Sequence, residues 1–177
     1  MNSLLEMIAA YHPIISCEGA AEEVIVRKLL DAGRLIFSET KVISVTRKRK
    51  ASDIQDEFLG FEYDWPVCII RVHDSRKEQF RLGNLYASRF PVWSFVTHPE
   101  MEILVILHEK QWDRWRKSKK KPSDFCKQDL GMKGIKSVSF LNNYWDADSI
   151  AKAALEYRRV SKIASGELCL ADLIRYP

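Results

Sequence analysis

Residues 13–23 read PIISCEGAAEE, and this stretch decides the fold. A short β-prone run ends in the carboxylate of Glu18, turns at Gly19 and continues into a pattern typical of a helix. In an open α/β sheet, ligands bind outside the carboxyl ends of the strands. Glu18 is therefore well placed to hold a hard cation or a polar substrate, provided that other acidic side chains meet it.

The composition is typical of one globular domain. The chain has 177 residues, of which 46% are hydrophobic and 29% are charged, enough to bury a substantial core. No apolar run approaches the ~18 residues of a membrane span, and Glu6 with no basic leader argues against a signal peptide. The four cysteines are far apart and form no CxxC pair, so we expect no zinc site, no disulfide and a cytoplasmic location.

The net charge of +4 hides an uneven distribution. The segment from Lys110 to Lys121 carries seven basic residues and a single acid, Asp113, and Arg47 to Lys50 is an unbroken basic run. The rest of the chain is therefore acidic. An acidic body with two basic segments suits a protein that holds a cation and also meets a polyanion.

The hydrophobic pattern alternates between strands and helices, which predicts a single α/β domain with a mostly parallel sheet flanked by helices, plus a helical C-terminal segment. We expect the core at 1–109 and a basic helical extension packed on it at 110–177. Residues 1–11 read as a short helix or frayed lead, and 46–60 as a polar connector. Strands are expected at 12–17, 42–45, 67–72 and 92–97. Helices are expected at 20–32, 77–89, 101–108, 110–118, 122–130 and 148–160. The apolar run at 101–108 also fits a buried strand, and the capping signal before it favours the helix.

Three helix ends carry capping signals. Gly33 sits where a C-terminal glycine cap belongs, and Asp148 can act as an N-cap. Thr97 and Glu100 match a capping box ahead of the apolar run that follows.

Acidic residues follow several of the expected strands. Glu18 and Asp74 each lie just past a hydrophobic strand, and Glu100 and Glu102 follow the next one. Carboxylates that meet at one sheet edge are typical ligands of Mg²⁺, or of Mn²⁺, and such a metal can activate water against a phosphodiester. Structural alternatives remain for three of the four: Glu18 in a turn or at a helix N-terminus, Asp74 in a turn, and Glu100 as the partner of Thr97.

Two histidines, His73 and His98, directly follow strands. A histidine in such a place is more often a structural hydrogen-bonding group than a catalyst.

The basic segment interleaves tryptophans with cations, as nucleic-acid-binding proteins do. Trp112 and Trp115, three residues apart, share one helical face, which also fits a solvated helix whose tryptophans pack on the core. We expect both: the tryptophans pack and the charges bind. The expected nucleic-acid-binding residues are Arg114, Arg116, Lys117, Lys119, Lys120 and Lys121.

Cys17-Glu18-Gly19, the strand-end Asp74, and Pro99-Glu100-Met101-Glu102 together resemble the motifs of the Toprim fold. The similarity is closest to small stand-alone Toprim-like proteins of the RloB-like type, and it extends to the overcoming-lysogenization-defect (OLD) nucleases. It covers roughly residues 12–109. The resemblance implies Mg²⁺-dependent cleavage of DNA or RNA, in a setting of bacterial phage defence.

The chain departs from the family pattern at the second motif. Toprim proteins usually have Asp-x-Asp there, whereas this chain has Asp74-Ser75-Arg76. Either Glu100 or Glu102 replaces the missing acid, or the site is degenerate.

Two hypotheses follow. In the first, the protein is a metal-dependent nuclease with Glu18 as general base or metal ligand, Asp74 as metal ligand, and Glu102 or Glu100 completing the site. In the second, it is a non-catalytic nucleic-acid-binding or regulatory module, for example beside an ATPase. DNA or RNA as substrate and homo-oligomerisation are left open.

Overall fold

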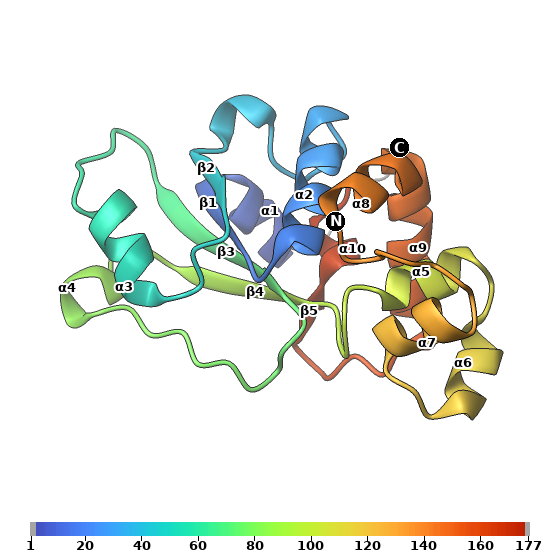
Figure 1. The fold of residues 1–177 in the computed structure, drawn as a ribbon. Coiled ribbons are helices and arrows are strands. Elements are labelled where there is room, and N and C mark those ends of the chain that lie inside the picture. The colour runs from blue at the N-terminus through green and yellow to red at the C-terminus, as the bar shows by residue number, and fades with distance from the viewer. Residues whose placement is uncertain (1–2, 176–177) are drawn as a thin grey trace.

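The computed structural model describes residues 3–175, and at its centre lies a five-stranded sheet (Figure 1). The strand order is β2-β1-β3-β4-β5, and each neighbouring pair is parallel. The strands are β1 (His12–Cys17), β2 (Ser44–Thr46), β3 (Val67–His73), β4 (Val92–Val96) and β5 (Leu168–Cys169). The α/β class with a parallel sheet flanked by helices is therefore confirmed.

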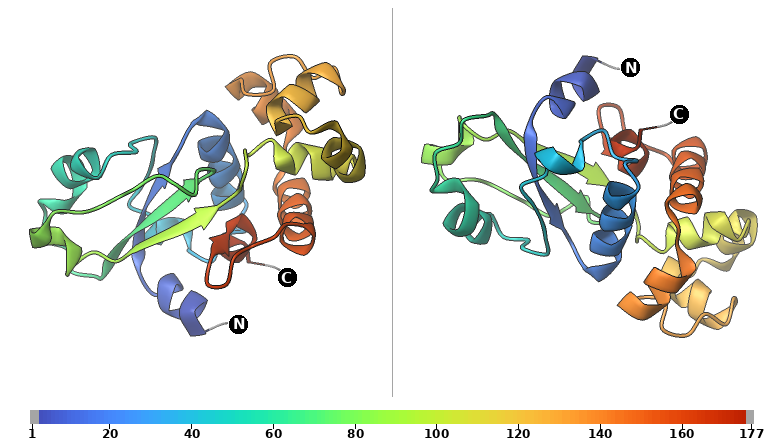
Figure 2. Two further views of the ribbon diagram at one scale, coloured as in Figure 1. Left: turned by 90° about the horizontal axis from the view of Figure 1, so that it is seen from below. Right: turned by 90° about the horizontal axis from the view of Figure 1, so that it is seen from above.

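Some helices pack against the sheet and others lie beyond the two ends of its strands (Figure 1). They are α1 (Ser3–Ala9), α2 (Ala20–Asp31), α3 (Ala51–Ile54), α4 (Asn84–Ala87), α5 (Ile103–His108), α6 (Trp112–Ser118), α7 (Pro122–Gln128), α8 (Val138–Tyr144), α9 (Ala147–Val160) and α10 (Leu170–Leu173). Two further helical turns complete the order: η1 (Glu39–Lys41) lies between α2 and β2, and η2 (Gln55–Leu59) lies between α3 and β3. Figure 2 shows α3 and α4 at one end and the orange and red C-terminal helices at the other. Within residues 3–175, no helix has the length and apolarity that crossing a bilayer requires.

The central strands are buried on both faces, which explains their continuous apolar runs. Because side chains alternate along a strand, Ile15 and Ile70 join the large core under α2, α5 and α9. Ile14 and Ile69 face a smaller core that includes Phe90. Every residue of β3 is buried, so the run from 67 to 72 was a clear strand signal.

The end of α2 follows its sequence signal. Gly33 has φ +64°, a conformation that glycine adopts without steric cost. Its N–H donates to Leu30 O at 2.9 Å, and the Arg34 N–H donates to Leu29 O at 2.8 Å. This is a Schellman motif, so the expected glycine cap is confirmed.

The helix expected at 77–89 is wrong over most of its length, and only Asn84–Ala87 within it is helical. Residues 74–83 form an extended loop, and the short α4 follows Gly83. The polar side chains of this loop bind elsewhere: Arg76 to Glu167 and Glu78 to Arg71. Those contacts replace the local hydrogen bonds of a helix, and Phe80 and Leu82 pack against the smaller core from an extended chain.

Two other caps also differ from expectation. Thr97 is buried and does not cap a helix, because α5 begins at Ile103. Glu100 instead accepts a hydrogen bond from the Ser123 N–H at 2.8 Å. At α9, the N-cap is Asp146, which forms a capping box with Ser149; the expected cap, Asp148, lies in the first turn and pairs with Arg34.

The remaining differences concern short elements. The second strand begins at Ser44 rather than at 42, because the Val42 N–H closes a turn onto Glu39 O. No sequence pattern indicated α8, α10 or β5. Leu168 of β5 pairs with Phe95 of β4, so the C-terminal segment contributes a strand to the sheet of the core.

Candidate functional site: an acidic cavity, a histidine cluster and a basic groove

Glu18 and Asp74 meet at the carboxyl edge of the sheet. In the parallel pair β1 and β3, Cys17 lies opposite Val72, so the residues that follow both strands emerge side by side. The Asp74 N–H donates to Glu18 Oε2 at 2.9 Å. The expectation that these two acids share one sheet edge is confirmed.

Two further acids join them around a cavity of about 210 Å³. Glu22 comes from the first turn of α2 and Glu102 from the N-cap of α5, and each is 5% exposed. Lys136 brings one positive charge, 3.7 Å from a Glu102 oxygen. Glu100 lies just outside the lining, 3.8 Å from Lys136 and bound to the start of α7.

The carboxyl groups of Glu18 and Asp74 respond to this setting in opposite directions. Burial alone would raise the pKa of Glu18, but hydrogen bonds from Asp74, the Arg49 guanidinium and the Ser75 N–H together lower it. Burial raises the pKa of Asp74 to about 7, helped by its hydrogen bond to Glu18 and by the charges of the neighbouring acids. Near neutral pH, Glu18 therefore carries the charge while Asp74 is partly protonated.

The two buried glutamates also resist ionisation. Burial raises the pKa of Glu22, and the charges of Glu18 and Glu102 add to the effect. Burial likewise raises the pKa of Glu102, although Lys136 opposes this. Among the described residues, the cavity thus gathers four carboxyl groups around one cation, Lys136. Full ionisation of these carboxyl groups would leave a net negative charge, which a bound cation would compensate.

A second cluster lies on the other side of Glu18. One ligand atom each from Glu18, His73 and Glu78 lie within 4.8 Å of one another, so these side chains could hold a metal ion. Among the described residues, the acids expected from sequence, Glu18, Asp74, Glu100 and Glu102, do not form a group this tight. Glu78 was missed because its segment was expected to be helical.

Arginine side chains bind the carboxylates of this second cluster. Arg49 Nη2 lies 2.9 Å from Glu18 Oε1 and 3.2 Å from Glu78 Oε1. The buried Arg71 donates to Glu78 Oε2 at 2.6 Å, and its guanidinium carbon lies 4.6 Å from the ring centroid of Phe80. Arg49 belongs to the basic run within the polar connector at 46–60, and it bridges both glutamates.

The two histidines contact the loop after β3. His73 Nδ1 lies 2.8 Å from Ser75 O, and His98 Nδ1 lies 3.3 Å from Asp74 O. His73 is 5% exposed, whereas His98 is exposed. Burial lowers the pKa of His73, and the charge of Arg71 lowers it further.

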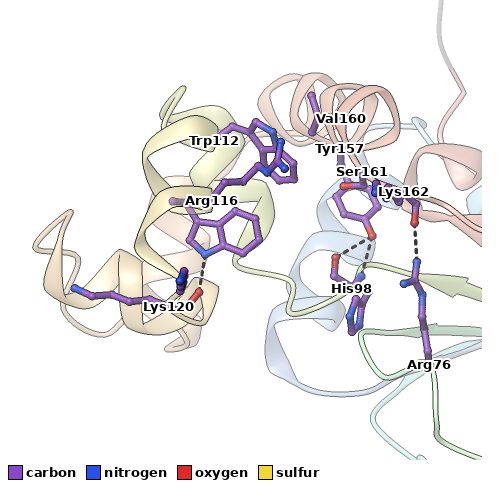
Figure 3. A pocket seen from close by; sticks show the side chains of 11 residues that line it. Arg76, His98, Trp112, Arg116, Lys120, Tyr157, Val160, Ser161 and Lys162 are labelled. Atoms are coloured by element: carbon purple, nitrogen blue, oxygen red, sulfur yellow. Dashed lines mark hydrogen bonds between the residues drawn. The ribbon is translucent and has the colours of Figure 1, made fainter.

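A basic groove of about 480 Å³ opens next to this edge (Figure 3). Arg76 and His98 line one side and α6 lines the other, with the end of α9 between them. His98 connects the groove to the acidic cavity, because its Nδ1 lies 3.3 Å from Asp74 O. Its cationic lining residues are Arg76, Arg116, Lys119, Lys120 and Lys162.

Three of the six expected nucleic-acid-binding residues, Arg116, Lys119 and Lys120, line this groove. Arg114 lies over the Phe125 ring, with 5.6 Å from its guanidinium carbon to the ring centroid, and 3.9 Å from Asp129. Lys117 and Lys121 are exposed outside the lining.

The tryptophans of α6 pack as expected. The rings of Trp112 and Trp115 lie 5.2 Å apart, and both contact the large core. Trp115 Nε1 donates to Lys120 O at 2.9 Å, which fixes the turn that carries the lysines.

Comparison of the chain with protein-family models, with curated proteins and with solved structures finds no match. Sequence reasoning missed Glu22, Glu78 and Lys136. The first had a usable signal, since Glu22 lies in the first turn of the helix expected directly after Glu18 and Gly19. Lys136 lies in a loop with no such signal.

Proposed function

We propose that this protein is a metal-dependent nuclease of the Toprim type. The observation that carries the proposal is the contact between Glu18 and Asp74 at the carboxyl edge of the sheet, beside the buried Glu22 and Glu102. Parallel α/β sheets bind their ligands at this edge. Clustered carboxylates with raised pKa values are typical of functional sites, because like charges are otherwise costly to bury together.

The acidic cavity fits a hard divalent cation, Mg²⁺ or Mn²⁺. Glu18, Asp74 and Glu102 line it and would hold the ion, and Glu100 lies next to it. All four offer oxygen ligands, as these ions prefer. Once bound, such an ion supplies charge stabilisation at a phosphodiester and a more acidic water.

Side chains at the cavity would carry out the proton transfer and the binding of the substrate phosphate. Glu18 keeps its charge near neutral pH, so it can accept a proton from an attacking water or bind the cation. Asp74 loses its proton as a cation approaches, since a positive charge lowers the pKa of a carboxyl group. Lys136, close to both Glu100 and Glu102, is suited to contact a substrate phosphate.

The basic groove gives a nucleic acid a path to this cavity. Its cations can contact successive phosphates, and Arg76 stands both in the groove and two residues from Asp74. We propose that Arg116, Lys119 and Lys120 guide the strand. A role in guiding the strand is less well supported for Lys117, Lys121 and Arg114, since they lie outside the groove. A role in bacterial phage defence remains part of the proposal through the family resemblance.

A non-catalytic binding module is the second candidate. It is favoured by Asp74-Ser75-Arg76, where the family has a second aspartate. Arg76 forms a bidentate pair with Glu167 at 2.7–2.8 Å, so this position has a structural partner. Such a module would keep the groove and act as a regulatory subunit, for example of an ATPase.

A cleavage assay distinguishes the two candidates. Labelled DNA and RNA are incubated with the protein in Mg²⁺, in Mn²⁺ and in a chelator. For the nuclease, Glu18→Gln should reduce metal-dependent cleavage by ~10²-fold or more, the scale of a general base, and leave binding intact. Glu23→Gln is the matched control, because Glu23 pairs with Arg27 and Arg47 outside the cavity.

Circular dichroism of both variants checks folding. Firm binding by the wild-type protein with no cleavage under either metal would favour the non-catalytic module.

A further inference from the structure

His73 is held as metal-binding histidines usually are. A carbonyl oxygen can only accept a hydrogen bond, so the 2.8 Å contact with Ser75 O requires the proton on His73 Nδ1. The lone pair of this neutral ring is then on Nε2. Metal-ligating histidines almost always donate their other ring N–H to a carbonyl or carboxylate in this way.

The other ring nitrogen of His73 has nothing to bind. Nε2 is buried and has no hydrogen-bond partner among the described residues. Buried polar atoms are rarely left unsatisfied, and each exception calls for an explanation such as an ion or a catalytic role. The ion pairs of Arg49 and Arg71 account for Glu18 and Glu78, but they leave this atom unexplained.

A cationic group already lies at the two carboxylates of the cluster. Arg49 Nη2 contacts Glu18 at 2.9 Å and Glu78 at 3.2 Å. The Arg49 side chain is about half exposed, at 47%, and it comes from a loop, so it can leave without opening the core. Arg71, in contrast, is 4% exposed and remains on Glu78.

We propose that Glu18, His73 and Glu78 form a binding site for a first-row transition-metal ion, such as Mn²⁺ or Zn²⁺, which replaces the guanidinium of Arg49. The exchange keeps a positive charge between the two carboxylates. It also gives the lone pair of His73 Nε2 a partner, which Arg49 does not provide in this arrangement.

The ligand set distinguishes this site from the acidic cavity. Imidazole nitrogen suits Zn²⁺ and its first-row neighbours, whereas Mg²⁺ prefers oxygen ligands alone. The cavity around Asp74 and Glu102 has carboxylate oxygens as its possible metal ligands and no histidine in the described part of its lining. Glu18 lies between the two and can contribute to either, so the histidine cluster adds a position that selects against Mg²⁺.

Metal binding by the purified, metal-stripped protein tests the proposal without any cleavage assay. Calorimetry with Mn²⁺ and with Zn²⁺ should detect a site that His73→Gln weakens by about 10-fold or more, the scale seen when a metal-binding histidine is disturbed. Pulsed electron paramagnetic resonance of bound Mn²⁺ should show coupling to a directly bound ¹⁴N in the wild type. That coupling should be absent in His73→Gln.

Two arginine variants keep the test valid even if His73→Gln folds poorly. Arg49→Gln should strengthen Mn²⁺ binding, because it removes the competing cation. Arg47→Gln removes the same charge from the same run, but Arg47 pairs with Glu23, so it should leave binding unchanged. Equal affinities in Arg49→Gln and wild type, or bound Mn²⁺ without nitrogen coupling, would overturn the proposal.

The readout also separates this inference from the proposed nuclease. Asp74→Asn should impair cleavage and the acidic cavity but keep the nitrogen-coupled Mn²⁺ signal. A protein that shows this signal and cleaves nothing would refute the nuclease alone.

Discussion

The acidic cavity and the basic groove lie side by side at the carboxyl edge of the sheet, yet they are built in different ways. The cavity brings together side chains that are partly or fully buried and repel one another, fixed by β1, α2, β3 and α5. The cations that α6 and the turn after it give to the groove are mostly exposed. Carboxylates held in fixed positions suit an ion of definite size. Exposed basic side chains can bind the phosphates of a polyanion in many alternative positions along the strand.

The largest effect that separates the two regions should come from Asp74→Asn. The native protein holds a proton on Asp74 up to about pH 7, whereas the ordinary value is 3.8. The native state therefore binds more protons than the unfolded state in this window, and wild-type stability falls as the pH rises through it. The amide removes that dependence, so the variant's melting temperature should fall less and exceed the wild-type value at about pH 8 by a few degrees.

Thermal melts in chelator across this pH range measure the difference. Glu18 does not obscure it, because a lowered pKa affects stability only as the pH falls below the ordinary 4.5. Parallel curves of melting temperature against pH for the two proteins would mean that the pKa of Asp74 is not raised by the cavity.

An intermediate effect is expected from neutralising the groove. Arg116→Gln with Lys119→Gln should weaken nucleic-acid binding and flatten its salt dependence. Each lost phosphate contact lowers the log–log slope by about 0.7–0.9. Lys117→Gln with Lys121→Gln removes the same charge outside the groove and should change the slope much less. Fluorescence anisotropy at several salt concentrations measures both, and equal slopes for the two pairs would reduce the groove to a general basic surface.

The smallest effect is expected from Gly19→Ala. Gly19 has φ −152°, which alanine also adopts, but a Cβ would lie 3.2 Å from Glu22 Oε2. The gain of about 0.4–1 kcal/mol from a stiffer unfolded chain should be offset by this crowding, so the free energy of unfolding should hardly change. Urea unfolding measures it. A loss well above 1 kcal/mol would show that Glu22 cannot shift and that the cavity is rigid.

The same contrast explains what could be predicted from sequence. Glu18 and Asp74 were placed correctly because strand ends are easy to find and parallel strands bring them to one edge. Glu78 was missed because its segment was expected to be a helix, and Lys136 because its loop carries no periodic signal. The groove unites Arg76 with Lys119 and Lys162, and only tertiary packing brings such distant residues together. The helix expected at 77–89 failed for a related reason, since its polar residues bind partners far along the chain.

The C-terminal closure of the sheet also has a consequence for the order in which the protein is made. β5 pairs with β4 across more than seventy positions, and residues 173–175 bond to residues 34–36 beside α2. A ribosome exposes α2 and the first four strands long before these partners appear. During that interval the edge of β4 is open to wrong pairing. Contacts this distant along the chain also slow folding. We therefore expect a transient, aggregation-prone intermediate during synthesis, which persists until residues 168–175 pair with β4 and with residues 34–36.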